Sequence, residues 1–278
     1  MPNGSPPSSR PYLGEDPSLA EARGTLRDAL GALGNLDQLL RSLRVGPKAI
    51  SAVLPDVLDS CGPARHAVRE LLSRTGARLG STNAVSELEH FFTPRFEELQ
   101  RSIELATRTP MHARHRLELE RVVTRLSPEL EAGRALLDLL EAALAAPTIR
   151  LKLRELLDQI TAAEFAKGTE PLRTTLRGRV EDIELLVQPQ VAMMLLTLGA
   201  NLVVEGHDAA TPELSVEARP DGGCTIRFQQ GSASGDALLL PRQTIVAPTL
   251  ACVETAATKM GCRVERGSDD STFSLTWA

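Results

Sequence analysis

The sequence predicts an α+β protein in which a long helical region precedes a smaller region of mixed helices and strands. Two observations predict this class. Apolar residues recur at spacings of three and four from residue 17 to about 146, which is typical of amphipathic helices. After residue 147, short β-like runs alternate with shorter helices, which favours an α+β sandwich. With 42% hydrophobic but only 3% aromatic residues, the cores must consist mainly of Leu, Ala and Val.

Composition excludes several classes of function. Lys and Arg number 31 against 36 Asp and Glu, and they form no dense basic block, which argues against a nucleic-acid-binding protein. The longest apolar run, 191–204, is too short for a membrane span, and no signal pattern opens the chain, so a cytoplasmic protein is expected. The four cysteines and five histidines lack metal-ligand spacing, which predicts reduced thiols and no metal site.

The first 80 residues divide into a tail and two helices. Residues 1–16 are rich in Pro, Ser and Gly and are expected to be disordered. A stripe of leucines predicts a first helix that ends before Gly46-Pro47. A second helix is expected over about 48–75, with an interruption at Cys61-Gly62-Pro63, because proline cannot continue the helical hydrogen-bond ladder.

Residues 81–146 predict a helical hairpin. Thr82 or Asn83 caps a third helix that ends at Thr109-Pro110, and a fourth helix runs over about 111–145. The apolar stripe of the fourth helix includes Leu117 and Val122. A lone hairpin cannot cover its apolar side, so we expect a homodimer in which two hairpins form a four-helix bundle. Residues 17–80 are then expected to add helical packing that enlarges the dimer core; the alternatives are an extension of the dimer coiled coil, a cover for the bundle and a second partner surface.

The region 147–278 predicts a sandwich of helices and strands. The expected elements, in chain order, are a helix at 152–165, strands at 171–176 and 181–187, a very apolar helix at 189–204, strands at 214–218 and 225–229, a helix at 249–260, and strands at 262–266 and 272–277. Because the helices and the antiparallel-leaning strands are segregated, an α+β sandwich follows.

Three stretches of this region carry a resemblance to a known family. They are IRLKLRELLDQITAAEFAKG (149–168), VQPQVAMMLLTLGANLVVEG (187–206) and PTLACVETAATKMGCRVERGSDDSTFSLTWA (248–278). Together with the preceding hairpin, their order resembles the core of the sensor histidine kinases over about residues 83–278. The resemblance implies a dimerisation and phosphotransfer hairpin followed by an ATP-binding domain, and a place in two-component signal transduction.

The sequence departs from that family where the family holds Mg-ATP. Asn201 matches the magnesium-binding asparagine of the family's asparagine box, but the earlier asparagine falls on Thr197. Gln229 or Gln230 stands where an aspartate accepts the adenine amine, and only Gly231 and Gly235 remain of the glycine pattern there.

The remaining two nucleotide-binding features of the family are also reduced. No glycine precedes the last helix in 245–249, and the family's flexible lid is reduced to 231–243. We therefore expect a degenerate ATP site that binds no cofactor.

The phosphoacceptor position is ambiguous in the segment Leu88–Pro94. Alignment on Thr93-Pro94 places Glu89 at the acceptor position, whereas alignment on the downstream apolar stripe places His90 there, with Phe91 in place of the activating acid. In both registers the autokinase chemistry lacks one part.

These observations predict a non-catalytic, kinase-like signalling protein, a pseudokinase. It is expected to bind the receiver domain of a response regulator, or a partner kinase, through His90, Phe91, Phe92 and Arg95. The alternative is a histidine phosphotransferase that relays phosphate through His90 without ATP. An active ATP-dependent kinase is the third hypothesis.

Overall fold

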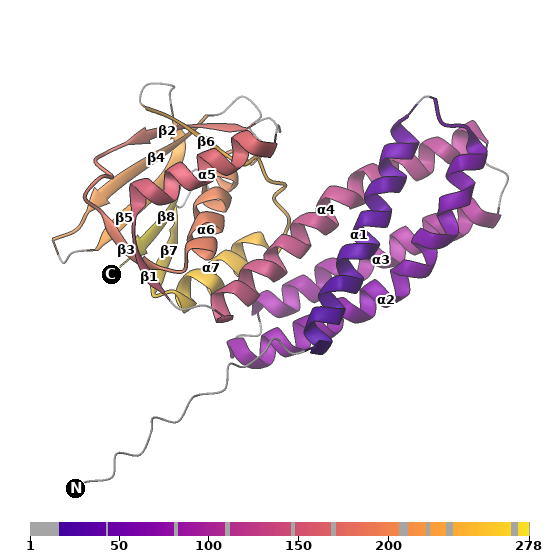
Figure 1. The fold of residues 1–278 in the computed structure, drawn as a ribbon, viewed down its shortest axis with the longest axis horizontal. Helices are drawn as coiled ribbons and strands as arrows, with labels where there is room; N and C mark the ends of the chain where they lie inside the picture. The colour runs from indigo at the N-terminus through magenta and orange to yellow at the C-terminus, as the bar shows by residue number, and fades with distance from the viewer. Residues whose placement is uncertain are drawn as a thin grey trace, which may run out of the picture.

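The computed structural model describes most of the chain beyond residue 16. The described ranges are 17–42, 44–80, 83–108, 112–145, 148–167, 171–205, 211–220, 223–231, 236–267 and 272–277. They form a helical bundle with an α+β sandwich at one end of it, so the predicted α+β class is confirmed (Figure 1). The predicted tail at 1–16 lies outside the described residues.

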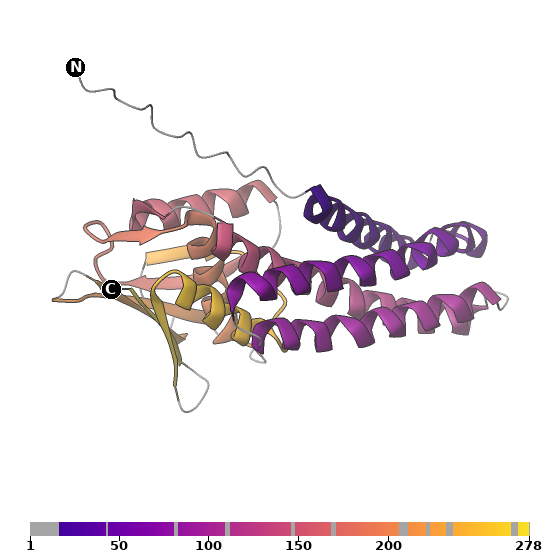
Figure 2. The ribbon, with the colours of Figure 1, turned by 90° about the horizontal axis from the view of Figure 1, so that it is seen from below.

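Four helices form the bundle. They are α1 (Pro17–Arg41), α2 (Pro47–Leu79), α3 (Asn83–Arg108) and α4 (Ala113–Ala145). Each helix packs against the next along the chain, and α1 also packs against α4, which closes the bundle. Figure 2 shows the four helices extending away from the sandwich. Leucine and alanine dominate the bundle core, as the composition predicted.

The apolar side of the α3–α4 hairpin is covered within the same chain. Helix α2 packs on α3 and helix α1 on α4, so the first hairpin supplies the surface that a second copy was expected to supply. The argument for a homodimer from an uncovered hairpin therefore does not hold. Instead of enlarging a dimer core, residues 17–79 complete the bundle of their own chain.

The predicted interruption of the second helix at Pro63 is wrong. Helix α2 runs through both Pro55 and Pro63. Both prolines lie on the exposed side, where a carbonyl that loses its helical partner can bond to water. On the opposite side, Cys61 and Ala64 are buried at 3% and 0% exposure, and their packing keeps the helix continuous.

The apolar stripe predicted for the fourth helix is wrong near the N-terminal end of that helix. Leu117 is 56% exposed and Val122 is only half-buried, while Leu119 and Val123 face the core at 3% and 0%. The remaining predicted leucines of this stripe, up to Leu140, are buried.

The sandwich holds a six-stranded sheet in the order β6-β2-β4-β5-β8-β7. Its elements are β1 (Ile149–Lys152), α5 (Leu153–Lys167), β2 (Leu172–Arg177), β3 (Glu184–Val187), α6 (Pro189–Leu202), β4 (Thr211–Ala218), β5 (Cys224–Gly231), β6 (Asp236–Leu240), α7 (Thr249–Lys259), β7 (Cys262–Arg266) and β8 (Thr272–Trp277). Strands β2 and β4 are parallel, and the other neighbours in this sheet are antiparallel. Strands β1 and β3 form a separate antiparallel pair.

Two strands were not expected from the sequence. Strand β6 lies inside the segment 231–243 that was predicted to be a reduced lid, and it pairs with β2 at the edge of the sheet. Strand β1 pairs with β3 directly before α5. Both are short, and their pairing partners are distant in the chain, so no local pattern marks them.

Helices α5, α6 and α7 cover one face of the sheet, and α6 lies over its centre. Gly199 of α6 allows this close packing. A Cβ atom there would lie 2.8 Å from Cε2 of Phe228 and 3.0 Å from Cδ1 of Phe273. The opposite face carries polar side chains, among them Arg177, Glu213 and Gln229.

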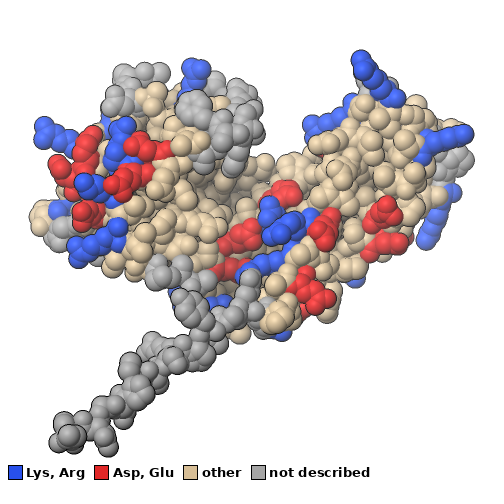
Figure 3. All heavy atoms as spheres, viewed as in Figure 1, with Lys and Arg blue, Asp and Glu red and all other residues tan. Residues whose placement is uncertain are grey.

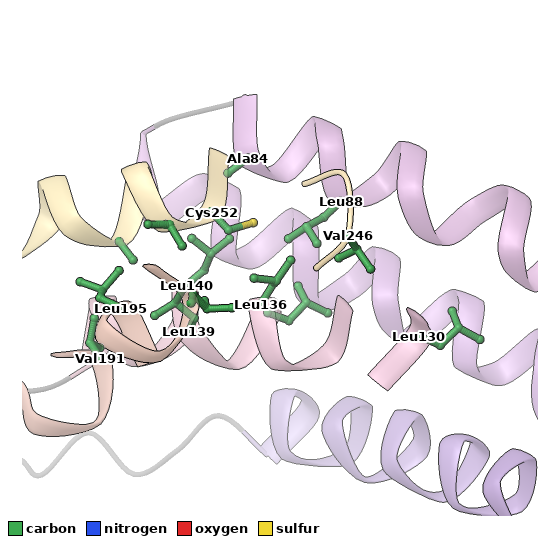
Figure 4. Close-up of a cluster of buried hydrophobic side chains, with 14 of the residues drawn as sticks. Ala84, Leu88, Leu130, Leu136, Leu139, Leu140, Val191, Leu195, Val246 and Cys252 are labelled. Carbon is green, nitrogen blue, oxygen red and sulfur yellow. The ribbon is translucent and has the colours of Figure 1, made fainter. Parts of the chain in front are cut away.

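The bundle and the sandwich share a buried apolar cluster (Figure 4). Its labelled side chains come from four helices and from the segment before α7: Ala84, Leu88, Leu130, Leu136, Leu139, Leu140, Val191, Leu195, Val246 and Cys252. All are at most 8% exposed. Because this cluster joins α3 and α4 to α6 and α7, it holds the sandwich against the end of the bundle. In the part of the chain that the structure describes, no helix is long and apolar enough to cross a membrane.

Candidate functional site

His90 lies on the exposed surface of α3, about two turns from the end that faces the sandwich. Its Nδ1 is 2.7 Å from the backbone oxygen of Ser86 and 3.4 Å from the Ser86 hydroxyl. A carbonyl oxygen only accepts, so the 2.7 Å bond requires the proton on Nδ1. The lone pair is then on Nε2, which is the nucleophilic nitrogen of this tautomer. Among the described residues, the hydrogen bonds of His90 involve Ser86 and no carboxylate.

The two phenylalanines after His90 do not lie on the surface. Phe91 and Phe92 are 3% and 1% exposed, and their rings pack edge to face at 5.4 Å between centroids. A Cβ atom on Gly133 of α4 would lie 2.7 Å from a ring atom of each phenylalanine. Both rings therefore belong to the bundle core, and the predicted docking surface is wrong for Phe91 and Phe92.

Arg95, the fourth predicted docking residue, is held by its own bundle. Its Nε is 2.5 Å from Oε2 of Glu129 on α4, and its Nη1 donates to the backbone oxygen of Phe91 at 2.9 Å. Its guanidinium carbon lies 3.7 Å from the centroid of the Phe91 ring, a cation–π distance. The positive charge of Arg95 is therefore already paired.

His90 and Arg95 line a cleft between α3 and the segment before α7. The cleft has a volume of about 390 Å³, and its other lining residues are Glu87, Phe91, Ala247 and Pro248. We call it the His90 cleft. It combines an exposed imidazole with apolar walls, and one side belongs to the sandwich. No local sequence signal indicated that Ala247 and Pro248 meet this face of α3.

Asn201, the predicted remnant of the magnesium position, is buried at 4% exposure near the end of α6. Its Nδ2 donates to the backbone oxygens of Thr197 at 2.8 Å and Pro241 at 2.9 Å. Its Oδ1 accepts the backbone N–H of Gln243 at 2.9 Å. The side chain therefore fastens the segment that follows β6 to α6.

The two glutamines at the predicted adenine position also bond within the chain. Gln230 donates from Nε2 to the backbone oxygen of Val203 at 2.9 Å, and Gln229 donates to Oε1 of Glu213 at 3.0 Å. Glu213 is 3% exposed, and its other oxygen is 3.0 Å from Nη2 of Arg177. This buried carboxylate, which sequence inspection missed, also accounts for Gly231, where a Cβ atom would lie 2.5 Å from Cβ of Glu213. Gly235 lies outside the described residues.

The start of α7, where the family's phosphate loop would lie, is closed by its own residues. Thr249 is 1% exposed, and its Oγ1 accepts the N–H of Val246 at 3.1 Å. Its own N–H donates to the Val246 oxygen at 2.9 Å. Pro248 contributes no N–H and is buried. The N–H groups of Val246 and Thr249 are therefore used within a local turn.

A second cavity, of about 260 Å³, lies between α4 and the α6–α7 layer. It is lined mainly by apolar and neutral side chains: Pro128, Glu131, Ala132, Ala135, Leu136, Met194, Leu198, Gln243, Thr244 and Thr249. Figure 3 shows a broad hollow between the sandwich and the far half of the bundle, with few charged side chains in it. Glu131 on the cavity wall is paired with Arg134 at 2.9 Å.

The other chemistry-bearing residues form no second site. His112 and His115, at the start of α4, have ring centroids 5.8 Å apart. All four cysteines are free and buried, as the sequence predicted. Burial raises the pKa of the Cys61 and Cys224 thiols to about 11 and that of Cys262 to about 12. Among the described residues, no group of three His, Cys, Asp or Glu side chains is arranged to hold a metal ion.

Comparison with known proteins finds similar solved structures but no matching family. No protein-family model matches the chain, and no curated protein matches it. A histidine kinase of Acinetobacter baumannii, AdeS, is 12% identical with a TM-score of 0.40, covering 66% of this chain and 94% of that chain. The EL346 blue-light activated histidine kinase of Erythrobacter litoralis is 12% identical with a TM-score of 0.28, covering 71% of this chain and 60% of that chain. Likenesses this weak assign no family, so the interpretation below depends on this chain's own contacts.

Proposed function

We propose that this chain is a histidine-kinase-like signalling protein that binds a receiver domain, or a partner kinase, at the His90 cleft and does not use ATP. The observation that carries the proposal is the engagement of Asn201. Its oxygen accepts the Gln243 N–H inside a site that is 4% exposed. A magnesium ion with its waters and phosphates needs accessible oxygen ligands, and this side chain offers none without releasing the chain segment it holds.

Three further observations support the proposal that the chain does not use a nucleotide. Gln229 and Gln230 each donate from Nε2 to another part of the chain, so both side chains are held in place by their own domain. The buried turn at Thr249 stands in place of a phosphate loop. The apolar cluster between bundle and sandwich opposes the domain motion that would carry a bound nucleotide to His90.

The His90 cleft supports a docking role. It is open, it joins the bundle to the sandwich, and it offers an imidazole beside the apolar surface of Ala247 and Pro248. Protein interfaces commonly combine an apolar centre with a few polar groups. The prediction of a docking patch is therefore kept for His90 and Arg95, with the exposed Ala247 added and the two buried phenylalanines removed.

The docking proposal is tested by binding a panel of purified receiver domains to the full chain on a biosensor. The variant pair His90→Ala with Ala247→Glu should abolish binding, because it removes the imidazole and places a charge on the apolar wall. The matched control is His66→Ala, since His66 is an exposed histidine on α2, away from the cleft. Binding that survives the cleft variant would reject this docking surface.

A second function, phosphate relay through His90, is favoured by the free Nε2. In that step the Nε2 lone pair attacks the phosphorus of a receiver aspartyl phosphate. A P–N bond forms, the P–O bond to aspartate breaks, and the aspartate leaves as a carboxylate. The Nδ1 proton stays on its bond to Ser86.

Incubation with a phosphorylated receiver separates relay from docking. Relay predicts an acid-labile label on the chain that His90→Ala removes, whereas docking alone predicts binding without label. The homodimer expected from the sequence stays a prediction, although the covered hairpin removes the argument on which it stood.

A further inference from the structure

We infer that the α1–α2 hairpin takes the place of a second subunit's hairpin, so that the chain acts as a monomer with one receiver-binding surface. The monomer follows from contacts within the bundle. The single receiver surface rests on the proposed function.

The two hairpins match in length and in spacing. Helices α1 and α3 have 25 and 26 residues, and helices α2 and α4 have 33 each. Helix α3 begins 66 residues after α1 (17 to 83), and α4 begins 66 residues after α2 (47 to 113). Buried positions repeat at this spacing in both halves: Ala22 and Leu88, Leu26 and Phe92, Leu30 and Phe96, Leu33 and Leu99, Val57 and Val123, Ala64 and Leu130, and Leu71 and Leu137.

Polar contacts fix α1 on α4 at three levels. Near the sandwich, Arg23 Nε is 2.6 Å from Oε2 of Glu141, which is 11% exposed. One turn before α1 ends at Arg41, the Thr124 hydroxyl donates to Oδ1 of Asp37 at 2.8 Å. Contacts at several levels along one seam specify a single register, which a loose apolar contact would not do.

The far end of the same seam is held by Arg116 of α4. Its guanidinium donates to the backbone oxygens of Leu40, Ser42 and Val45 at 2.8, 2.9 and 3.0 Å. These carbonyls lie at the end of α1 and in the turn that follows, where helical partners are missing. One side chain therefore caps α1 and joins it to α4.

The closed bundle leaves little apolar surface for a second copy. In the described part of the bundle, the exposed large apolar side chains are Leu105 and Leu117, both 56% exposed. Stable dimer interfaces bury on the order of 1,200 Å² or more and are rich in apolar side chains. Two leucines near one end of the bundle do not provide such a surface.

The two hairpins differ where a receiver would bind. At the spacing of 66 residues, Gly24 corresponds to His90 and Ala29 to Arg95. The second hairpin also contacts α7 of the sandwich, through both α3 and α4. A two-fold dimer would present two His90 clefts, whereas this bundle presents one.

Light scattering on the full chain tests the monomer. A mass of 30.0 kDa at micromolar concentration is expected. About twice that mass, maintained on dilution, would overturn the inference.

Cross-linking within the seam tests which chain supplies the covering hairpin. We would replace the bonded pair as Asp37→Cys with Thr124→Cys and treat the protein with a short bis-maleimide. The native thiols are at most 3% exposed and react slowly by comparison. A cross-linked band at monomer mass in a denaturing gel is expected. A band at dimer mass would show that hairpins are exchanged between copies, and would overturn the inference. Each single variant serves as a control and should give no cross-link.

The receiver complex separates this inference from the proposed function. A receiver that binds should give a complex of one receiver with one chain. If the chain is a cross-linked monomer and no receiver binds, the bundle inference stands and the proposed function fails. If a receiver binds a two-chain particle, the proposed function stands and the single-chain bundle is wrong.

Discussion

The His90 cleft and the Asn201 pocket differ in whether their polar atoms can meet another molecule. His90 is exposed, its Nδ1 is bonded to Ser86, and the residue lines a cleft of about 390 Å³. Asn201 is 4% exposed, and both ends of its amide are bonded to the chain's own backbone. The side chain at the proposed acceptor position is therefore open, while the side chain at the proposed remnant of a magnesium position is part of the core.

Under the proposed function, this difference is the reason that the chain would bind a receiver domain and no nucleotide. The side chains of Asn201, Gln230 and Thr249 are all bonded to the chain's own backbone. Buried polar groups must be bonded to something, and here the chain itself provides the partners. Residues that resemble a ligand site can therefore remain for structural reasons alone.

The largest effect should come from filling the space below the His90 cleft. Gly133→Leu would force a side chain against the rings of Phe91 and Phe92, and overpacking of this kind costs about 3 kcal/mol. Urea unfolding should show a large fall in the midpoint. Gly62→Ala is the control, because Gly62 is exposed on α2 with no atom near its missing Cβ, and it should gain up to about 1 kcal/mol. An unchanged midpoint for Gly133→Leu would show that the core here is loose.

The closed pocket can be broken by Asn201→Ala. This change removes three hydrogen bonds and leaves the Gln243 N–H without its acceptor, so unfolding free energy should fall by about 2–3 kcal/mol. Asn35→Ala, at an exposed position on α1, should change it by less than about 0.5 kcal/mol. Equal effects of the two variants would mean that Asn201 is not structural.

The buried Cys61 thiol should make the stability of the protein depend on pH. Burial raises the pKa of Cys61 to about 11, above the usual range for an unfolded chain. Above pH 9 the unfolded state loses this proton first, so stability should fall with rising pH by up to about 1.4 kcal/mol per pH unit from this thiol. Denaturation at pH 7, 9 and 10 measures the slope. Cys61→Ala should flatten it above pH 9 and leave it unchanged below pH 8; an unaltered slope would contradict the burial effect.

The smallest effect on stability should come from His90 itself. Because the side chain is exposed and bonded only within its own helix turn, His90→Ala should shift unfolding free energy by less than about 0.5 kcal/mol. If phosphate is relayed, the same variant should also abolish the transfer of a phosphoryl label from a receiver to this chain. A fall in unfolding free energy of several kcal/mol would show that His90 packs in the core, and would contradict an open cleft.

The sequence predicted the regular elements well where pattern and punctuation agree. Strands β7 and β8 have the predicted bounds, 262–266 and 272–277, and the apolar helix α6 begins at the predicted Pro189. Here alternation, a glycine-containing turn and the start of a helix at proline act together. The turn residues 268–271 lie outside the described residues.

The arrangement of those elements was harder to predict. An amphipathic stripe shows that a face is buried but does not identify its partner, so a covering α1–α2 hairpin and a second copy gave the same signal. Phe91 and Phe92 are adjacent and were assigned to the surface with His90, yet both fit inside the bundle because Gly133 on α4 leaves space for their rings.

The hydrogen bonds of Asn201 and Gln229 join residues that are distant in the chain. The sequence indicated missing glycines and a missing aspartate, but it did not indicate what replaced them. Asn201 bonds to Gln243 across 42 residues, and Gln229 bonds to Glu213 across 16. Such pairs are fixed by the sheet order and by strand β6, and neither has a local signature.

Calorimetric titration of the full chain with Mg-ATP tests the central claim most directly. We predict no saturable heat up to about 1 mM nucleotide, which limits any binding free energy to about −4 kcal/mol. Saturable binding of one nucleotide per chain, weakened by Asn201→Asp, would mean that the Gln243 segment opens readily, and the claim of a closed site would be wrong.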